Sequence, residues 1–162
     1  MINHIVHLRI SKATAESFYS FLTNPTDDLY QKWLPDEHWA FHTVKKGGKS
    51  PLGDLVYFDE ILGNKKYRLT FYATITKAEK PNRIFWQMRK FALNLPGYLE
   101  ISFVDTSAGL AIKHEVKIGW PGVGVVIDPL IRLVYNKSFF NALEGHCKRE
   151  WECLAEILPG KS

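Results

Sequence analysis

Apolar side chains recur at every second position from about residue 38 to residue 119, and this alternation constrains the fold more than any other feature. A period of two is typical of strands that bury one face. Turn residues rich in glycine, proline and asparagine divide the stretch into predicted strands near 38–44, 54–62, 66–78, 83–90, 97–105 and 110–120. Short connections of this kind join antiparallel neighbours, so the sequence predicts an antiparallel sheet.

One further strand precedes this stretch and a long helix follows it. Residues 2–10 alternate in the same way, and helical spacing predicts two short helices over 11–22 and 26–33. The C-terminal helix is predicted over 129–158. Its apolar residues recur at spacings of seven, three and four and form one stripe: Leu133, Phe140, Leu143, Cys147, Trp151, Leu154 and Leu158. The order of elements predicts an α+β fold with seven strands.

Composition narrows the class of protein. A length of 162 residues suits a single domain over residues 1–162, and the 14% of aromatic residues favours a wide interior or a lined pocket. The 21 basic and 17 acidic residues are interspersed, without the broad basic face of a nucleic-acid binder. No apolar run approaches 18 residues and no signal-like segment begins the chain, so we expect a cytoplasmic protein without membrane insertion. The sequence leaves the oligomeric state open, a homodimer included.

Several polar side chains fall on faces that should be buried. His146 and Glu150 are four residues apart on the C-terminal helix, on one face beside the apolar stripe. Glu60 is in phase with the apolar residues of its strand, and His114 is in phase with those of the last strand. A buried carboxylate is costly unless it is paired or binds a metal ion. These residues are therefore the candidates for chemistry.

A metal site is one interpretation of this set. His38 stands where the chain enters the sheet, and His42, four residues on, is the alternative nitrogen donor. Two histidines and two glutamates can supply the nitrogen and oxygen ligands of a tetrahedral zinc site. The alternative is a buried salt-bridge network, which a strand glutamate and a helical His-x-x-x-Glu pair form more often. The residue pattern alone favours the network.

The order of elements resembles the helix-grip fold of the START and Bet v 1-like superfamily, which includes polyketide cyclase-like proteins. The resemblance covers nearly the whole chain. It implies a curved seven-stranded antiparallel sheet wrapped around the long C-terminal helix, with two short helices between the first two strands. It also implies an apolar or aromatic small molecule held between sheet and helix. A fold of this kind does not by itself define a function.

A second resemblance rests on a set of motif residues: Trp33-x-Pro35-x-x-His38, Glu60 and His146-x-x-x-Glu150. Together they are similar to the diacetylphloroglucinol hydrolase family, a zinc-dependent branch of the same fold that cleaves a carbon–carbon bond between an acyl group and an aromatic ring. The resemblance implies a zinc ion bound by His38, Glu60, His146 and Glu150. The chain differs from that family at Leu34 and at Trp151, and the larger Trp151 is expected to narrow the pocket or change its substrate.

Three functions follow from these observations. The first is a metal-dependent hydrolase of a small apolar or aromatic ketone, in which His114 is the catalytic proton donor or acceptor. The second is a non-catalytic binder or carrier of a hydrophobic small molecule. The third is a metal-free polyketide cyclase or dehydratase that uses His114 with Glu60. A core histidine bonded to a neighbour is the structural alternative for His114. The expected pocket lining includes Phe58, Phe71, Ile112 and Trp120.

Overall fold

The computed structural model spans residues 1–162 and describes all of them except 64, 91–92, 120–128, 130, 134 and 159–162. The elements, in chain order, are β1 (Ile2–Ile10), α1 (Ala15–Thr23), α2 (Asp27–Trp33), β2 (His38–Lys45), β3 (Leu55–Leu62), β4 (Tyr67–Glu79), β5 (Arg83–Lys90), β6 (Leu93–Thr106), β7 (Gly109–Ile118) and α4 (Lys137–Ile157). The seven strands form one antiparallel sheet in the order β1-β7-β6-β5-β4-β3-β2. The predicted strands and their number are confirmed.

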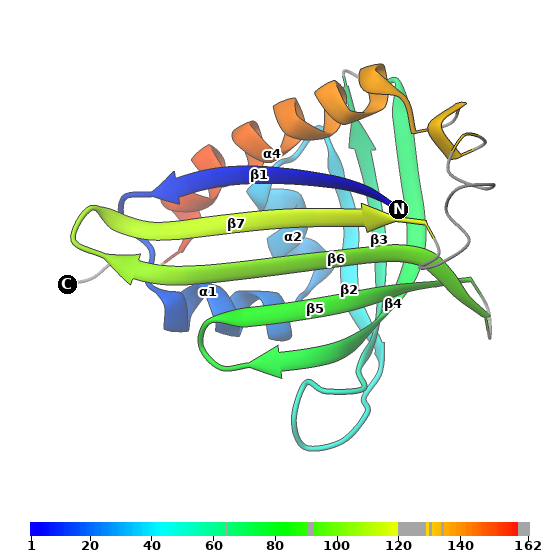
Figure 1. Ribbon diagram of the computed structural model, residues 1–162. Helices are drawn as coiled ribbons and strands as arrows, with labels where there is room; N and C mark the ends of the chain where they lie inside the picture. The colour runs from blue at the N-terminus through cyan, green and yellow to red at the C-terminus, as the bar shows by residue number, and fades with distance from the viewer. Residues whose placement is uncertain (64, 91–92, 120–128, 130, 134, 159–162) are drawn as a thin grey trace.

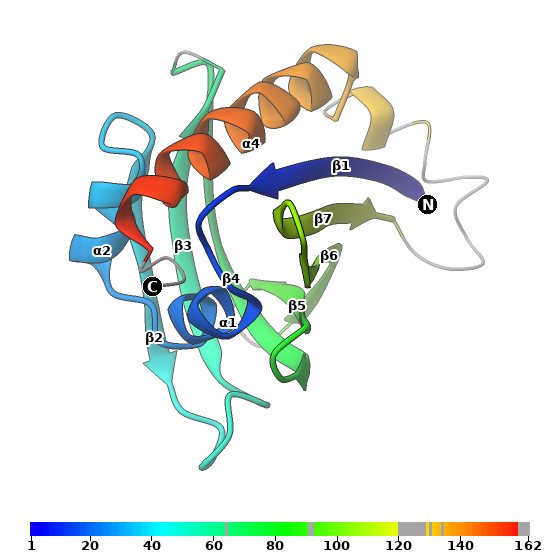
Figure 2. The same ribbon diagram turned by 90° about the vertical axis from the view of Figure 1, so that its left-hand side faces the viewer.

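The sheet curves around α4, which crosses its open side (Figures 1 and 2). Figure 2 shows α1 and α2 at one end of this curve, beside the C-terminal part of α4. Apolar side chains of the concave face and of α4 form the core, with Trp86, Phe18 and Phe41 among the largest fully buried residues. This arrangement is the predicted α+β helix-grip fold. No described helix carries an apolar stretch long enough to cross a bilayer.

The two short helices form where side-chain oxygens cap their first turns. Thr14 accepts a hydrogen bond from the backbone N–H of Ser17 at 3.1 Å, and the Ser17 hydroxyl accepts one from the backbone N–H of Thr14 at 3.1 Å. Thr26 caps the first turn of α2 in the same manner at 3.3 Å. Such caps satisfy donors that a helix start leaves free. They place Tyr30 and Trp33, both buried, on the inner side of α2.

The C-terminal helix differs from the prediction at its start. Asn136 is extended and accepts a hydrogen bond from the N–H of Phe139 at 3.2 Å, so α4 begins at Lys137, and the helical residues 129 and 131–133 belong to a separate segment. The predicted continuous helix over 129–158 is therefore wrong in its first part. Leu133 is 75% exposed and does not join the buried stripe. The rest of the stripe packs against the sheet, as predicted.

Candidate functional site

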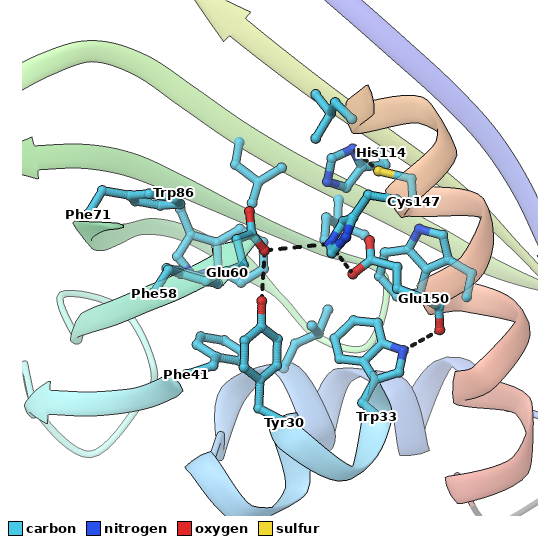
Figure 3. A pocket seen from close by; sticks show the side chains of 16 residues that line it. Tyr30, Trp33, Phe41, Phe58, Glu60, Phe71, Trp86, His114, Cys147 and Glu150 are labelled. Atoms are coloured by element: carbon cyan, nitrogen blue, oxygen red, sulfur yellow. Dashed lines mark hydrogen bonds and ion pairs between the residues drawn. The ribbon is translucent and has the colours of Figure 1, made fainter. Parts of the chain in front are cut away.

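The side chains of His38, Glu60, His146 and Glu150 meet between β2, β3 and α4. Nε2 of His38 lies 3.3 Å from Nε2 of His146 and 3.4 Å from Oε2 of Glu150. Nε2 of His146 lies 3.5 Å from the same Glu150 oxygen and 3.7 Å from Oε2 of Glu60. Figure 3 shows Glu60 and Glu150 reaching toward this point from the sheet and the helix. The structure thus brings together the four residues of the metal hypothesis.

Local structure explains how residues so far apart in sequence converge. His38 and Glu60 are direct cross-strand partners at the end of β2 and β3. His146 and Glu150 are one turn apart on the face of α4 that points into the sheet. All four are mostly buried, with His38 and His146 each 1% exposed. The cluster therefore lies inside the fold rather than on its surface.

Each imidazole is fixed through its second ring nitrogen. Nδ1 of His146 lies 2.6 Å from a carboxylate oxygen of Glu37, and Nδ1 of His38 lies 3.2 Å from the backbone carbonyl oxygen of Tyr30. A carbonyl accepts only, as does an ionised carboxylate, so both Nδ1 atoms act as donors. Glu37 is held in turn by Arg149 at 2.6 Å. Both Nε2 atoms are thereby directed at the shared point.

The carboxylates are oriented as well. The phenol of Tyr30 donates to Oε2 of Glu60 at 2.7 Å. The indole N–H of Trp33 donates to the backbone carbonyl of Glu150, which ties α2 to α4 (Figure 3). Burial strongly raises the pKa of the Tyr30 phenol, with a further contribution from Glu60, so the phenol stays a neutral donor. The site consists of ligand-type atoms held by a second layer of hydrogen bonds.

Charges within the cluster shift the pKa values of His146 and Glu150 in the direction opposite to the effect of burial. Burial alone would lower the pKa of His146, but the carboxylates of Glu150, Glu60 and Glu37 raise it to about 9. Burial would raise the pKa of Glu150, but His146 and His38 lower it to about 2. Without a metal ion, the cluster is therefore held by a protonated His146 among carboxylates. This is the salt-bridge arrangement that the residue pattern favoured, and its atoms are also those that a cation would contact.

His114 occupies the wall next to this cluster. It is 6% exposed, and its Nδ1 lies 3.7 Å from Sγ of Cys147 (Figure 3). Burial lowers the pKa of His114 to about 4, so its imidazole is neutral near pH 7. Burial also raises the pKa of the Cys147 thiol, which therefore stays protonated. A neutral imidazole in this position is a weak base and is better suited to hydrogen bonding with a ligand.

His42 does not reach the cluster. The register between β2 and β3 shifts between His38 and Ala40, so that Phe41 turns inward and His42 turns outward. Nδ1 of His42 lies 2.8 Å from Asp27 on the half-exposed outer side. The alternative in which His42 replaces His38 has no support in this geometry.

Glu60, His146 and Glu150 line a cavity with two adjoining chambers, whereas His38 lines neither of them. The inner chamber has a volume of about 50 Å³ and is lined by Glu60, His114, His146, Glu150 and mostly aromatic neighbours. The outer chamber, about 450 Å³, shares Glu60, Phe71, Leu99, His114 and Leu143 with the inner one and is otherwise mainly apolar. A volume of this size suits a small ligand. The predicted cavity between sheet and helix is therefore confirmed.

The predicted lining is confirmed only in part. Phe58 lines the inner chamber and Phe71 lines both chambers. Ile112 is buried in the core but lines neither chamber. Trp120 lies outside the described residues. Trp151, which the sequence suggested would narrow the pocket, is 2% exposed and forms part of the inner wall.

Sequence reasoning missed the residues that orient the cluster. Glu37 is adjacent to a predicted ligand but precedes the predicted strand, so no period gave the direction of its side chain. Tyr30 and Arg149 lie in predicted helices and belong to neither of the motifs from which the site was predicted. The available signal was proximity: Glu37 precedes His38, and Arg149 precedes Glu150.

No protein-family model matches the sequence, and no curated protein matches it significantly. Solved structures do resemble the fold. A protein from Chromobacterium violaceum superposes with a TM-score of 0.58 at 15% identity, covering 99% of this chain and 100% of that one. The structure of Ara h 8.0201 gives a TM-score of 0.54 at 15% identity over 90% of this chain and 96% of its own.

The di-domain ARO/CYC protein BexL, from the BE-7585A biosynthetic pathway, gives a TM-score of 0.62 at 14% identity. The match covers 99% of this chain and 51% of BexL, so this chain spans about half of that protein. At such identities the likeness concerns the fold alone. The chain has an α+β helix-grip fold, which it shares with BexL and with Ara h 8.0201.

Proposed function

We propose that this protein is a metal-dependent hydrolase that binds a zinc ion through His38, Glu60, His146 and Glu150 and acts on a small apolar or aromatic ketone. One observation carries the proposal: two buried imidazoles direct their Nε2 atoms at each other, 3.3 Å apart, between two carboxylates. Four of the separations among these atoms are 3.3–3.7 Å, close to those expected for ligands about 2.0–2.2 Å from a common ion. Ligand atoms of His38, Glu60 and His146 all lie within 4.8 Å of one another, while Glu150 belongs to a neighbouring group of the same kind with His114 and Cys147.

The charges around the cluster support the same proposal. Glu37, Glu60 and Glu150 contribute three negative charges and Arg149 contributes one positive charge, which leaves two negative charges when both histidines are neutral. A proton on His146 offsets one of them. A divalent cation would offset both, and it would replace the proton between the facing nitrogens. Buried charges of one sign are costly unless they are compensated, so the donor set fits a divalent ion.

A zinc ion at this point would polarise a carbonyl group or lower the pKa of a bound water molecule. The chain's own residues would supply the rest. Glu37 and the Tyr30 carbonyl keep the imidazoles in the tautomer that exposes Nε2. The apolar outer chamber excludes water and orients the ligand toward the cluster. His114, the predicted proton donor or acceptor, would as a neutral imidazole on the inner wall act mainly by hydrogen-bonding the reacting group.

A metal-free binder, or a cyclase or dehydratase using His114 with Glu60, is the second candidate. The structural likeness to BexL, an ARO/CYC protein, and to Ara h 8.0201 supports this candidate. The two candidates share the cavity and differ in what the cluster does. The wider of the two chambers would hold a hydrophobic ligand in either case.

Elemental analysis of freshly purified protein tests the proposal directly. We expect close to one zinc ion per chain, retained through gel filtration and lost on treatment with a chelator. The zinc-loaded protein should then hydrolyse acylated phenols or related diketones, and the stripped protein should not. Absence of any divalent metal binding by titration calorimetry would leave the metal-free candidate. Metal binding without turnover of such ketones would refute the hydrolase and leave a metal-containing binder.

A further inference from the structure

A second group of ligand-type side chains lies beside the first, on the wall of the inner chamber. It consists of His114 on β7 and of Cys147 and Glu150 on α4, and each offers a ligand atom within 4.8 Å of the other two. Figure 3 shows the sulfur of Cys147 beside the ring of His114, with Glu150 further along the helix. The proposed zinc site takes no ligand from His114 or Cys147, so their placement needs an explanation of its own.

The distance between the nitrogen and the sulfur suits a metal ion. Nδ1 of His114 lies 3.7 Å from Sγ of Cys147. A tetrahedral zinc ion, with bonds of about 2.0–2.1 Å to nitrogen and about 2.3 Å to sulfur, would hold these two atoms about 3.6 Å apart. Because no separation in the group exceeds 4.8 Å, Glu150 would have to approach by at most about 1.2 Å to complete the ligand set. An ion can therefore replace the hydrogen between His114 and Cys147 with little change in the fold.

The inner chamber has room for ions rather than for an organic ligand. His114, Cys147 and Glu150 all line it, and its volume is about 50 Å³. A space of about 10–15 Å³ is enough for one water molecule, whereas pockets for small molecules measure roughly 300–1,000 Å³. The three side chains thus border a space of the size that a metal ion and its bound water require.

The donor types define the class of ion. Thiolate and imidazole ligands suit zinc and cobalt, whereas magnesium and calcium prefer oxygen ligands. The carboxylate of Glu150 can serve two ions, because it has two oxygens and belongs to both groups of ligand atoms. Its Oε2 lies 3.4 Å from His38 and 3.5 Å from His146 in the first group.

We propose that His114, Cys147 and Glu150 form a second metal site, in which Glu150 bridges a thiophilic divalent ion and the zinc ion of the proposed function. Binding exchanges the S–H bond of Cys147 for a bond from Sγ to the ion, and the proton leaves to solvent. Nδ1 of His114 supplies a lone pair, so Nε2 keeps the ring proton and remains a donor to the ligand. Pairs of ions about 3.5–4 Å apart are typical of two-metal hydrolytic centres. The inference rests on the proposed function for the first ion only.

The second ion binds more weakly than the first. It has three protein ligands rather than four, and the charge of the first ion repels it across the shared carboxylate. It is therefore lost during gel filtration, and the one zinc ion expected in freshly purified protein belongs to the first site. Titration with added metal is needed to detect the second.

The test is a titration of stripped protein with Co²⁺, followed by calorimetry and by the near-ultraviolet absorption of a cobalt–thiolate bond. We expect two ions per chain at saturation, with the thiolate absorption rising as the second ion binds. Cys147→Ser should weaken binding of the second ion at least about 100-fold and abolish this absorption, while the first ion still binds. Cys153→Ser is the matched control, because Cys153 is on the same helix but lines neither chamber, and it should change neither readout.

A measurement on the unaltered chain keeps the test independent of whether Cys147→Ser folds. With excess zinc, X-ray absorption at the zinc edge should show one sulfur ligand for every two zinc ions. Absence of sulfur from the zinc ligands would overturn the second site whatever the variant does.

The outcomes separate this inference from the proposed function. Saturation at one ion without thiolate absorption would overturn the second site and leave the proposed function intact. A single ion that is lost in Cys147→Ser but is insensitive to Glu60→Gln would refute the four-residue zinc site and retain the site at His114 and Cys147. A chain that binds no cobalt or zinc at all would refute both.

Discussion

Replacing Glu60 with Gln is the most direct perturbation of the proposed metal centre. The two side chains have the same shape, so Glu60→Gln removes one negative charge with little change in packing. The amide can still accept the hydrogen bond that Tyr30 donates to the carboxylate at 2.7 Å. In the unaltered chain, Oε2 of Glu60 lies 3.7 Å from Nε2 of His146, across the point where an ion would be held. The substitution therefore changes charge at the centre and leaves the surrounding fold in place.

The expected loss follows from this geometry. A unit charge at roughly 4 Å from a partner contributes on the order of 4 kcal/mol at an effective dielectric constant near 20. For a divalent ion the same distance would give more, but solvation of the exposed edge of Glu60 offsets part of it. We therefore expect zinc affinity to fall about 1,000-fold, which corresponds to about 4 kcal/mol. Unfolding of the metal-free variant should change by less than about 1 kcal/mol, because attraction to His146 and repulsion from Glu150 are lost together.

Zinc affinity is measured by competition with a chromogenic chelator, and unfolding by urea titration of stripped protein. Glu100→Gln is the matched control: Glu100 is also a buried strand glutamate, paired with Arg83 at 2.7 Å, and it lines neither chamber. That variant should keep the full zinc affinity. A Glu60→Gln protein that binds zinc as tightly as the unaltered chain would refute the assignment of Glu60 as a ligand.

Three further outcomes are expected. Glu37→Gln should lower zinc affinity about 10- to 100-fold in the same competition assay, since Glu37 orients His146 without contacting the ion. Nearby lysines hold the pKa of Glu115 near 2 against an ordinary 4.5, despite the opposing effect of burial. Because the pKa of Glu115 is depressed in the folded state, its ionised carboxylate stabilises the fold above pH 4.5, and this contribution disappears as the pH falls toward 2. In urea titrations between pH 6 and pH 2, Glu115→Gln should be about 1–3 kcal/mol less stable than the unaltered chain at pH 6 and nearly equal to it at pH 2. Gly109→Ala should cost about 1–3 kcal/mol in the same titration, because φ is +111° and a Cβ would overlap the carbonyl of Ile10.

The parts of the fold that depend on periodicity could be predicted from the sequence. Val56, Phe58 and Leu62 share a face by simple alternation, and all three are buried. Glu60 lies in the same phase, which is why a carboxylate could be placed inside before any distance was known. His146 and Glu150 followed from the helical repeat in the same way. The period of a strand or helix determines which way each side chain points, and this was sufficient to place Glu60, His146 and Glu150 inside the fold.

Periodicity did not predict the positions where the backbone departs from regular strand geometry. Strict alternation from His38 would put His42 on the inner face as well, which is why the two were interchangeable candidates. The register shift after His38 breaks that phase and brings Phe41 inward instead. A bulge inserts one residue and exchanges the faces of all that follow. No period in the sequence reveals it, because the residue types on both sides suit a strand.

The start of α4 was missed for a related reason. The apolar spacing from Leu133 continues without interruption into the helix, but Asn136 bonds its own following turn and so begins a new helix. Asparagine favours caps because its side chain competes with the backbone for hydrogen bonds. A capping residue inside a regular apolar stripe does not interrupt its spacing, so the spacing alone does not show where the helix begins. The exposed Leu133 is the consequence.

The position of the cluster is itself an argument for function. The helix that carries His146 and Glu150 also presents Leu143 and Leu154, one turn to either side, which are buried against the same sheet. A chain selected for stability alone would continue that apolar surface, because hydrocarbon side chains usually stabilise a core at least as well as a buried ionic network does. Instead, polar residues from β2, β3 and α4 gather beside the cavity, and a second layer of hydrogen bonds orients them. Such a departure from the local pattern is expected where a fold has to hold a ligand or an ion.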